Sequence, residues 1–174
     1  PAMSEGKLLG FQLWINMPAK SKMNKPEYLY IKNNQLGVHE DAEKIVKVIA
    51  GKFEKAEGPE KGHNVDPIYF HVVLEKDKKF KCDVPSEHNS FVYLLTGDLS
   101  IGENKHDKTS NSNLILLDRG DKLIVKANKK SEFLFIAGKP IGEPIARGGP
   151  FVMNTKAEIL QAVQDYHNGT FAKY

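Results

Sequence analysis

Short runs in which apolar and polar residues alternate constrain this chain more than any other feature of its sequence. The runs are rich in Ile, Val, Phe, Tyr and Leu, as in strands that bury one face. They predict strands at residues 11–16, 43–50, 68–75, 90–95, 99–101, 114–118, 122–126 and 132–137. Turn residues separate the runs, for example at 96–98 and 119–121. Many short strands at this spacing predict an all-β sandwich or jelly-roll barrel, and no alternating helices suggest a parallel α/β sheet.

One helix is expected near the end of the chain, over residues 155–168. Thr155 and Glu158 have the spacing of a capping box, in which each side chain accepts a hydrogen bond from a free backbone N–H group. Apolar residues then recur at helical spacing, at positions 159, 162, 163 and 166, and predict one buried face. Asn168-Gly169 is a typical C-terminal end of a helix.

Two stretches are expected to be irregular. Residues 17–35 contain Pro18, Pro26 and several lysines, which is typical of a connector. Residues 103–113 are almost entirely polar and predict an exposed loop or hairpin.

Charge and composition exclude several classes of function. The 174 residues carry a formal net charge of +3, and Arg119 and Arg147 are the only arginines. We therefore do not expect direct nucleic-acid binding, since base recognition depends on clustered arginines. No apolar run is long enough for a membrane helix or a signal peptide, and Pro1-Ala2 ahead of Met3 is typical of residues left by cloning. A single cysteine, Cys82, suits a reducing compartment, so a cytoplasmic or nuclear location is expected.

The residues alone offer no convincing catalytic set. The six histidines are His39, His63, His71, His88, His106 and His167, and no His-x-His pair occurs among them. His71 is expected in a strand as an interior or edge residue. His88, next to Glu87 and Asn89, is the best single candidate for a pocket residue, although supporting metal ligands are missing. The sequence contains neither a nucleophile elbow nor a phosphate-binding glycine loop.

Several segments resemble one known family. Residues 10–18, Gly-Phe-Gln-Leu-Trp-Ile-Asn-Met-Pro, are similar to the middle of the pirin family, which belongs to the cupin superfamily. Residues 135–145 and 149–155 are similar to its end, and residues 91–98 are similar to its second barrel. The resemblance is collinear from residue 10 to about residue 171.

The resemblance implies a cupin-type jelly-roll β-barrel, the double-stranded β-helix, with an N-terminal extended segment and one short C-terminal helix. Pirins carry two such barrels in one chain of nearly twice this length. We therefore expect residues 1–40 to be an extended segment and connector left from a first barrel. Residues 41–174 are expected to form the second barrel with its terminal helix. The first barrel, which holds the family's metal-binding histidines and glutamate, is not expected in this chain.

The resemblance also assigns the four cupin ligand positions of the second barrel. They correspond to Asp83, Pro85, Asn89 and Phe133, or to its neighbour Glu132 in the last case. Because proline and phenylalanine cannot bind a metal, we expect a degenerate site with no metal and no catalytic residue of its own. Iron is expected only through pairing with a metal-binding first cupin.

These expectations favour a non-catalytic protein-interaction module of the transcription-cofactor type that the family implies. Phe11, Leu13, Trp14 and Ile15 are the candidate interaction surface, since an apolar patch of that size needs a cover. The cover is expected to be a second copy of the chain or a protein partner. One alternative is a subunit or fragment of an iron-dependent quercetin dioxygenase whose metal lies in a separate cupin. A second alternative is a β-barrel that binds a small molecule in its mouth.

Overall fold

The structure is a computed structural model that describes residues 5–6, 9–60, 64–102 and 114–172, and the backbone of residues 108–110. The chain divides into two compact units. Unit 1 joins residues 1–25 to residues 143–174, and unit 2 contains residues 26–142. The predicted domain boundary at residue 40 stays a prediction. Each unit is described by itself.

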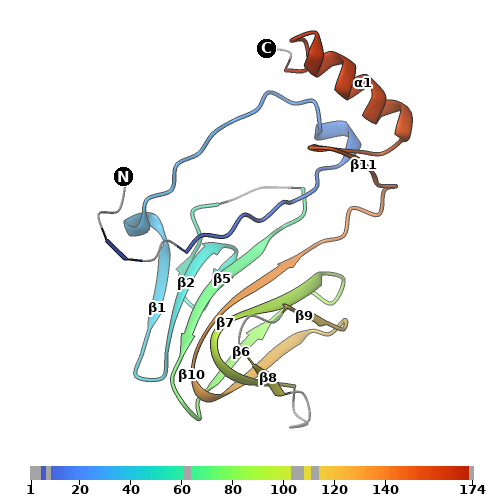
Figure 1. The fold of residues 1–174 in the computed structure, drawn as a ribbon. Coiled ribbons are helices and arrows are strands. Elements are labelled where there is room, and N and C mark those ends of the chain that lie inside the picture. The colour runs from blue at the N-terminus through green and yellow to red at the C-terminus, as the bar shows by residue number, and fades with distance from the viewer. Residues whose placement is uncertain (1–4, 7–8, 61–63, 103–107, 111–113, 173–174) are drawn as a thin grey trace. The chain divides into compact units, whose positions relative to one another are not determined.

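Unit 2 is an all-β domain of the expected cupin type (Figure 1). Its main sheet has the order β1-β2-β5-β10-β7-β8, with β6 added to β10 and β9 added to β7; among the described residues it does not close into a ring. The strands of this sheet are β1 (Gly37–Glu40), β2 (Lys44–Ala50), β5 (Ile68–Leu74), β6 (Lys79–Asp83), β7 (Asn89–Ile101), β8 (Lys108–Ser110), β9 (Leu114–Leu117) and β10 (Lys122–Gly138). A small hairpin, β3 (Lys52–Phe53) with β4 (Ala56–Glu57), and the short 3-10 turn Asn33–Gln35 complete the unit.

The long strand β10 belongs to both layers of the fold. Residues 131–137 pair with β5, whereas residues 122–126 pair with β6. Strand β7 follows the same course, because it pairs with β10 along nearly its whole length. The shared bend therefore turns one sheet back on itself and encloses an interior.

The bend is built from irregular pairing and side-chain hydrogen bonds. The register between β7 and β10 shifts between residues 127 and 133. Gly97 has a φ of +103°, and a Cβ atom there would lie 2.6 Å from the Cα of Ser131. Ser131, which is buried, accepts a hydrogen bond from the backbone N–H of Asp98 (3.0 Å) and donates one to the carbonyl of Lys129 (2.7 Å). Glycine is therefore required at position 97, where the two backbones approach each other.

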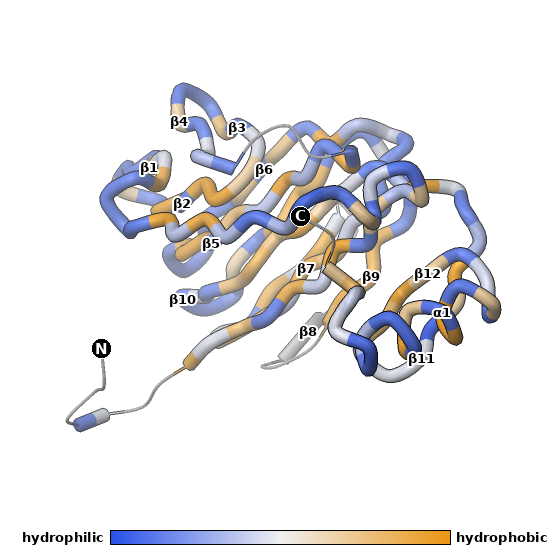
Figure 2. The backbone as a smooth tube through the Cα atoms, turned by 90° about the horizontal axis from the view of Figure 1, so that it is seen from above, coloured by the Kyte–Doolittle hydropathy of each residue, from blue (hydrophilic) through white to orange (hydrophobic). Residues whose placement is uncertain are grey.

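The core lies between the two layers and follows the strand alternation. In β5 the buried residues Phe70, Val72 and Leu74 alternate with half-buried ones, and in β6 Phe80 and Cys82 alternate with exposed lysines. Figure 2 shows the resulting change between hydrophobic and hydrophilic residues along the strands of this unit. Period-two patterning thus determines which side chains enter the core.

Unit 1 combines the N-terminal segment with the end of the chain. It contains the 3-10 turn Ala19–Ser21, the hairpin of β11 (Ala146–Gly148) and β12 (Phe151–Met153), and helix α1 (Lys156–His167). The Glu143 carboxylate connects the two parts, because it accepts hydrogen bonds from Ala19 N–H and from the Asn154 amide, both at 2.8 Å. None of the helices in the described part of the chain has the length and apolar character needed to cross a membrane.

The C-terminal helix α1 forms as the sequence predicts. Glu158 N–H donates to the Thr155 hydroxyl at 3.2 Å, and Thr155 N–H donates to the Glu158 carboxylate at 2.7 Å, as in the predicted capping box. Ala162 is buried and Ile159 is half-buried, whereas Tyr166 on the same predicted face is exposed. The buried face of the helix is therefore narrower than predicted.

Several strand predictions need correction. Residues 11–16 form no strand and take part in no ladder among the described residues. The predicted turn at 96–98 is a bend inside β7, and the strands predicted at 122–126 and 132–137 are both parts of β10. The sequence patterns did not predict β1, β3, β4, β6, β8, β11 or β12. The irregular connector at 17–35 is confirmed, and most of the loop predicted at 103–113 lies outside the described residues.

The stability of unit 2 is expected to depend on its buried aromatic residues. We expect Phe80→Ala to lower the free energy of unfolding by about 3–5 kcal/mol, because Phe80 is fully buried and its removal leaves a cavity. Denaturant unfolding followed by circular dichroism measures this change. Tyr28→Ala, at a 91% exposed position in the same unit, is the control and should change stability by less than about 0.5 kcal/mol. Equal effects of the two substitutions would contradict the packing described here.

Candidate functional site

Phenylalanine rings pack against one another in the interior of unit 2. Phe53 stacks on Phe80 with ring centroids 5.3 Å apart, and Phe80 meets Phe133 edge-to-face at 5.7 Å. Phe70 contacts both Phe53 and Phe135, at 5.8 and 6.0 Å. Contacts of this kind stabilise an apolar core and offer no ligand atom to a metal ion.

The four predicted ligand positions do not face one common space. Asp83, at the end of β6, has a 91% exposed side chain, and its carboxylate lies 4.0 Å from the Lys122 ammonium. Pro85 and Asn89 are also exposed, whereas Phe133 is completely buried in the core. The structure thus brings none of the first three residues together with Phe133. That these positions correspond to former ligands stays a prediction.

The inward-facing residues of this stretch are the neighbours of the predicted ones. Cys82 and Val84 are buried in the core, one position before Asp83 and Pro85. The sequence analysis missed this because it did not predict β6. The signal is present, since Phe80, Cys82 and Val84 alternate with Lys79, Lys81 and Asp83.

His88 is one of the residues that line a pocket in unit 2, and its functional role stays a prediction. It is only 5% exposed, and its Nδ1 atom has no hydrogen-bond partner in the described structure. The pocket has a volume of about 490 Å³, and its lining includes Pro85, Glu87 and Asp66. Nevertheless, the described residues contain no group of three or more His, Cys, Asp or Glu side chains placed to hold a metal ion.

The other three described histidines make local contacts, and that of His167 is with the neighbouring ring of Tyr166 at the end of α1. The His71 ring nitrogen Nε2 lies 2.6 Å from the Glu132 carboxylate across β5 and β10, and His39 Nε2 lies 3.1 Å from Asp41. Both contacts are of the kind that fixes a side chain within a sheet or turn. His63 and His106 lie outside the described residues.

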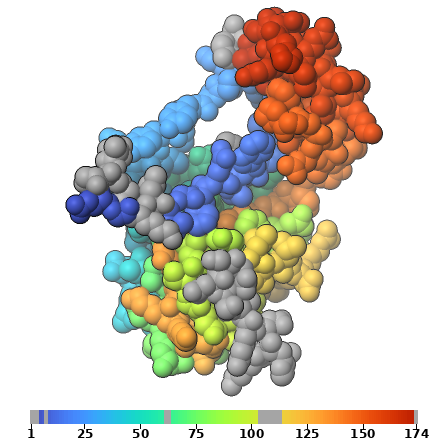
Figure 3. All heavy atoms as spheres, in the orientation of Figure 1, coloured from blue at the N-terminus to red at the C-terminus, as the bar shows by residue number. Residues whose placement is uncertain are grey.

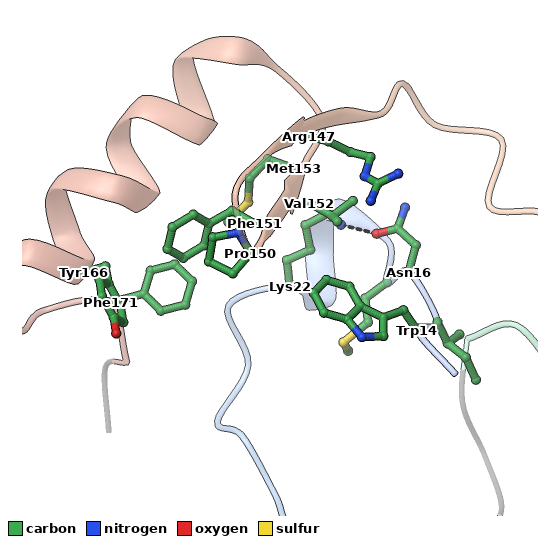
Figure 4. A pocket seen from close by; sticks show the side chains of 12 residues that line it. Trp14, Asn16, Lys22, Arg147, Pro150, Phe151, Val152, Met153, Tyr166 and Phe171 are labelled. Atoms are coloured by element: carbon green, nitrogen blue, oxygen red, sulfur yellow. Dashed lines mark hydrogen bonds between the residues drawn. The ribbon is translucent and has the colours of Figure 1, made fainter. Parts of the chain in front are cut away.

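A second candidate site is a groove within unit 1, here called the Trp14 groove. Its volume is about 790 Å³, and the N-terminal segment, the β11–β12 hairpin and the end of the chain all contribute side chains. Figure 4 shows the aromatic rings of Phe151, Tyr166 and Phe171 toward one end and Trp14 nearer the other. The full lining comprises Trp14, Ile15, Asn16, Met17, Lys22, Arg147, Pro150, Phe151, Val152, Met153, Tyr166 and Phe171. Most of these side chains are aromatic or aliphatic, and two of them, Lys22 and Arg147, are positively charged.

Both cations of the groove lie toward the end that Figure 4 draws beside Asn16. The Lys22 ammonium donates a hydrogen bond to the Asn16 side-chain oxygen at 2.5 Å. Nearby, hydrogen bonds from the Thr155 hydroxyl and backbone lower the pKa of Glu158, and the charge of Lys22 lowers this pKa further. Arg147 is exposed on β11, and no lining residue of the groove is acidic. The groove therefore has a positive end.

The predicted interaction surface is only partly included in this groove. Trp14 and Ile15 line it and are 60% and 49% exposed, whereas Phe11 and Leu13 do not line it. In Figure 3 the N-terminal segment is visible at the molecular surface in dark blue. Phe11, Trp14 and Ile15 of this segment are exposed, whereas Leu13 is half-buried. That these residues form an interaction surface stays a prediction.

Comparison with known proteins identifies the family to which this fold belongs. A family model, the pirin C-terminal cupin domain, matches residues 69–172. The chain belongs to the pirin family. A pirin-like protein from Caulobacter vibrioides is 36% identical over 98% of this chain and 62% of its own length. Human pirin is 34% identical over 95% of this chain and 58% of its own length.

A solved structure supports the same assignment. The crystal structure of a quercetin 2,3-dioxygenase from Acinetobacter baumannii superposes with a TM-score of 0.83 and 31% sequence identity, covering 92% of this pirin and 56% of that chain. This pirin thus spans less than two thirds of the length of each of these relatives. The match confirms the cupin-type fold predicted from the sequence.

Cys82 offers a direct test of the closed interior of the pirin domain. Burial, together with the negative charge of Asp83, raises the pKa of the Cys82 thiol to about 12. Since only the thiolate reacts, we expect a thiol reagent such as DTNB at pH 8 to modify the folded chain on the order of a thousandfold more slowly than free cysteine. The urea-unfolded chain is the control and should react at the free rate. Rapid reaction of the folded chain would show that the core opens readily.

Proposed function

We propose that this pirin domain is a non-catalytic protein-interaction module, of the cofactor type rather than an independent enzyme. The Trp14 groove carries the proposal, because it combines exposed aromatic and aliphatic side chains with two cations. Aromatic residues and arginine are enriched where protein interfaces form. A contiguous apolar surface of this kind is more typical of a binding site than of free protein surface.

The described residues of unit 2 do not fit iron. Val84 and Phe133 occupy interior positions and have no ligand atoms, and the Cys82 thiol stays protonated at neutral pH because its pKa is about 12. Among the described residues, His88 belongs to no group of three ligating side chains placed to hold a metal ion, so no metal-dependent reaction step is proposed for this unit. The packed phenylalanine core also argues against a small-molecule barrel.

A second candidate function follows from the likeness to the quercetin dioxygenase structure. This chain covers about half of that protein, 56%, with a TM-score of 0.83. On this hypothesis the chain is the second cupin of a dioxygenase, and a separate cupin supplies the iron. The two hypotheses differ in one prediction: only the second predicts that adding a separate metal-binding cupin to this chain produces dioxygenase activity.

Association in solution tests the interaction role. We expect light scattering to show self-association as the chain concentration rises from low micromolar to several hundred micromolar, because docking buries Trp14 and its neighbours. Trp14→Ser should weaken this association by about tenfold or more. Tyr28→Ser, at another exposed aromatic residue, is the matched control and should leave it unchanged. A monomer across the whole series would exclude self-association as the cover of the groove.

Iron binding tests the non-catalytic half of the proposal. Calorimetric titration with Fe(II), with elemental analysis of the purified chain, should detect no stoichiometric metal, and the chain alone should not consume quercetin. If one iron binds per chain, His88→Ala identifies whether His88 is a ligand. Tight binding that depends on His88 would contradict the proposal and favour the dioxygenase.

A further inference from the structure

We propose that the Trp14 groove binds an extended protein segment that carries a carboxylate among apolar side chains. This inference rests on the proposed interaction function. The carboxylate would bind at the positive end, between Arg147 and Lys22. Its apolar neighbours would cover Trp14 and the aromatic rings of Phe151 and Phe171. Four features of unit 1 support this occupant.

The first feature is charge. Lys22 and Arg147 are both positive, and none of the 12 side chains that line the groove is acidic. Lys22 is half-buried, and its ammonium has an amide oxygen, that of Asn16, as its hydrogen-bond partner. A carboxylate between the two cations would complete the charge balance of the groove and add charge-assisted hydrogen bonds.

The second feature is that Glu158 cannot serve as this carboxylate. Its side chain already accepts hydrogen bonds from Asn154 N–H, Thr155 N–H and the Thr155 hydroxyl, at 3.0, 2.7 and 3.0 Å. These contacts form the N-terminal cap of α1, and losing them would free backbone donors of the helix. The Glu143 carboxylate of the same unit is also engaged, since it accepts hydrogen bonds from Ala19 N–H and from the Asn154 amide, both at 2.8 Å. Neither carboxylate lines the groove, so we expect a bound partner to supply the counter-charge.

The third feature is the open backbone beside the groove. In the described part of unit 1, β11 and β12 pair only with each other, so each has one edge outside the ladder. Residues 9–16 form no strand at all. A segment that adds to a sheet edge gains backbone hydrogen bonds, while pockets beside the edge select its side chains. An extended peptide fits this arrangement.

The fourth feature is the exposure of the groove. Trp14 is 60% exposed and Tyr166 is 65% exposed, whereas a small-molecule site buries most of its ligand. An open aromatic surface favours a protein segment over a small aromatic acid. The small aromatic acid remains a distinct outcome of the test.

Trp14 is the only tryptophan in the chain, so its fluorescence reports directly on the groove. The probe is a library of short extended peptides with a central Glu or its isosteric Gln, flanked by randomised apolar residues. We expect peptides with Glu to be selected, to shift the Trp14 emission to shorter wavelength, and to bind roughly tenfold tighter than their Gln twins. Raising the salt concentration should reduce that preference.

Arg147→Gln should remove most of the preference for Glu over Gln, and Arg147→Lys should retain part of it, since it keeps the charge but loses the planar fork. Arg119→Gln is the matched control, because Arg119 is the only other arginine and does not line the groove. Unchanged thermal unfolding of each variant shows that the fold is intact.

The proposal is overturned if Glu and Gln peptides bind equally, if Arg147→Gln and Arg119→Gln have the same effect, or if no peptide shifts the Trp14 emission. It is also overturned if naphthoate binds as tightly as the best peptide, which would identify a small-molecule site. If self-association depends on Trp14 but not on Arg147, the proposed interaction function is supported and only the proposal of an acidic partner is contradicted. A chain that stays monomeric and binds no peptide would contradict both the interaction function and the acidic partner.

Discussion

The bend shared by β7 and β10 is the constraint on which the domain depends. A long two-stranded ladder can border both sides of a core only if it turns, and it turns where Gly97 lies against Ser131. The polar groups exposed by the irregular pairing find partners in the bend itself: the Asn128 amide donates to the Asp98 carboxylate at 2.7 Å and to the Ser100 hydroxyl at 3.0 Å. Without these contacts the bend would leave buried polar groups unpaired, which is costly in an apolar interior.

The same bend determines which side chains meet in the core. It places the inward face of β6 opposite the inward faces of β5 and β10, and the residues that meet there include Phe80 and Phe133. Aromatic side chains of β5, β6 and β10 pack against one another in this interior. A cupin architecture is thus compatible with purely structural packing, and the fold alone does not imply the chemistry of its relatives.

The proposed recognition site, by contrast, lies in unit 1, where the chain is less regular. The β11–β12 hairpin, the capped helix and the N-terminal segment together form a groove that is apolar along its length and positive at one end. Apolar burial would supply affinity there, whereas a buried carboxylate would supply specificity, because other partners would leave the cations of the groove without a counter-charge. The longer relatives of this pirin have additional chain that could provide such a segment.

The sequence by itself determined the features that depend on neighbouring residues. The capping box at Thr155 and Glu158 and the alternation in β2 and β5 are local signals, and both elements form as predicted. Tertiary structure decided what depends on distant pairing. Residues 11–16 have a strand pattern but form no strand, since a strand also needs a partner for its backbone hydrogen bonds. The pattern of β6 is present in the sequence, but its pairing with β10 is a long-range contact that only the fold establishes. The groove could not be predicted either, because Trp14, Arg147 and Phe171 are far apart in the chain and only folding brings them to one surface.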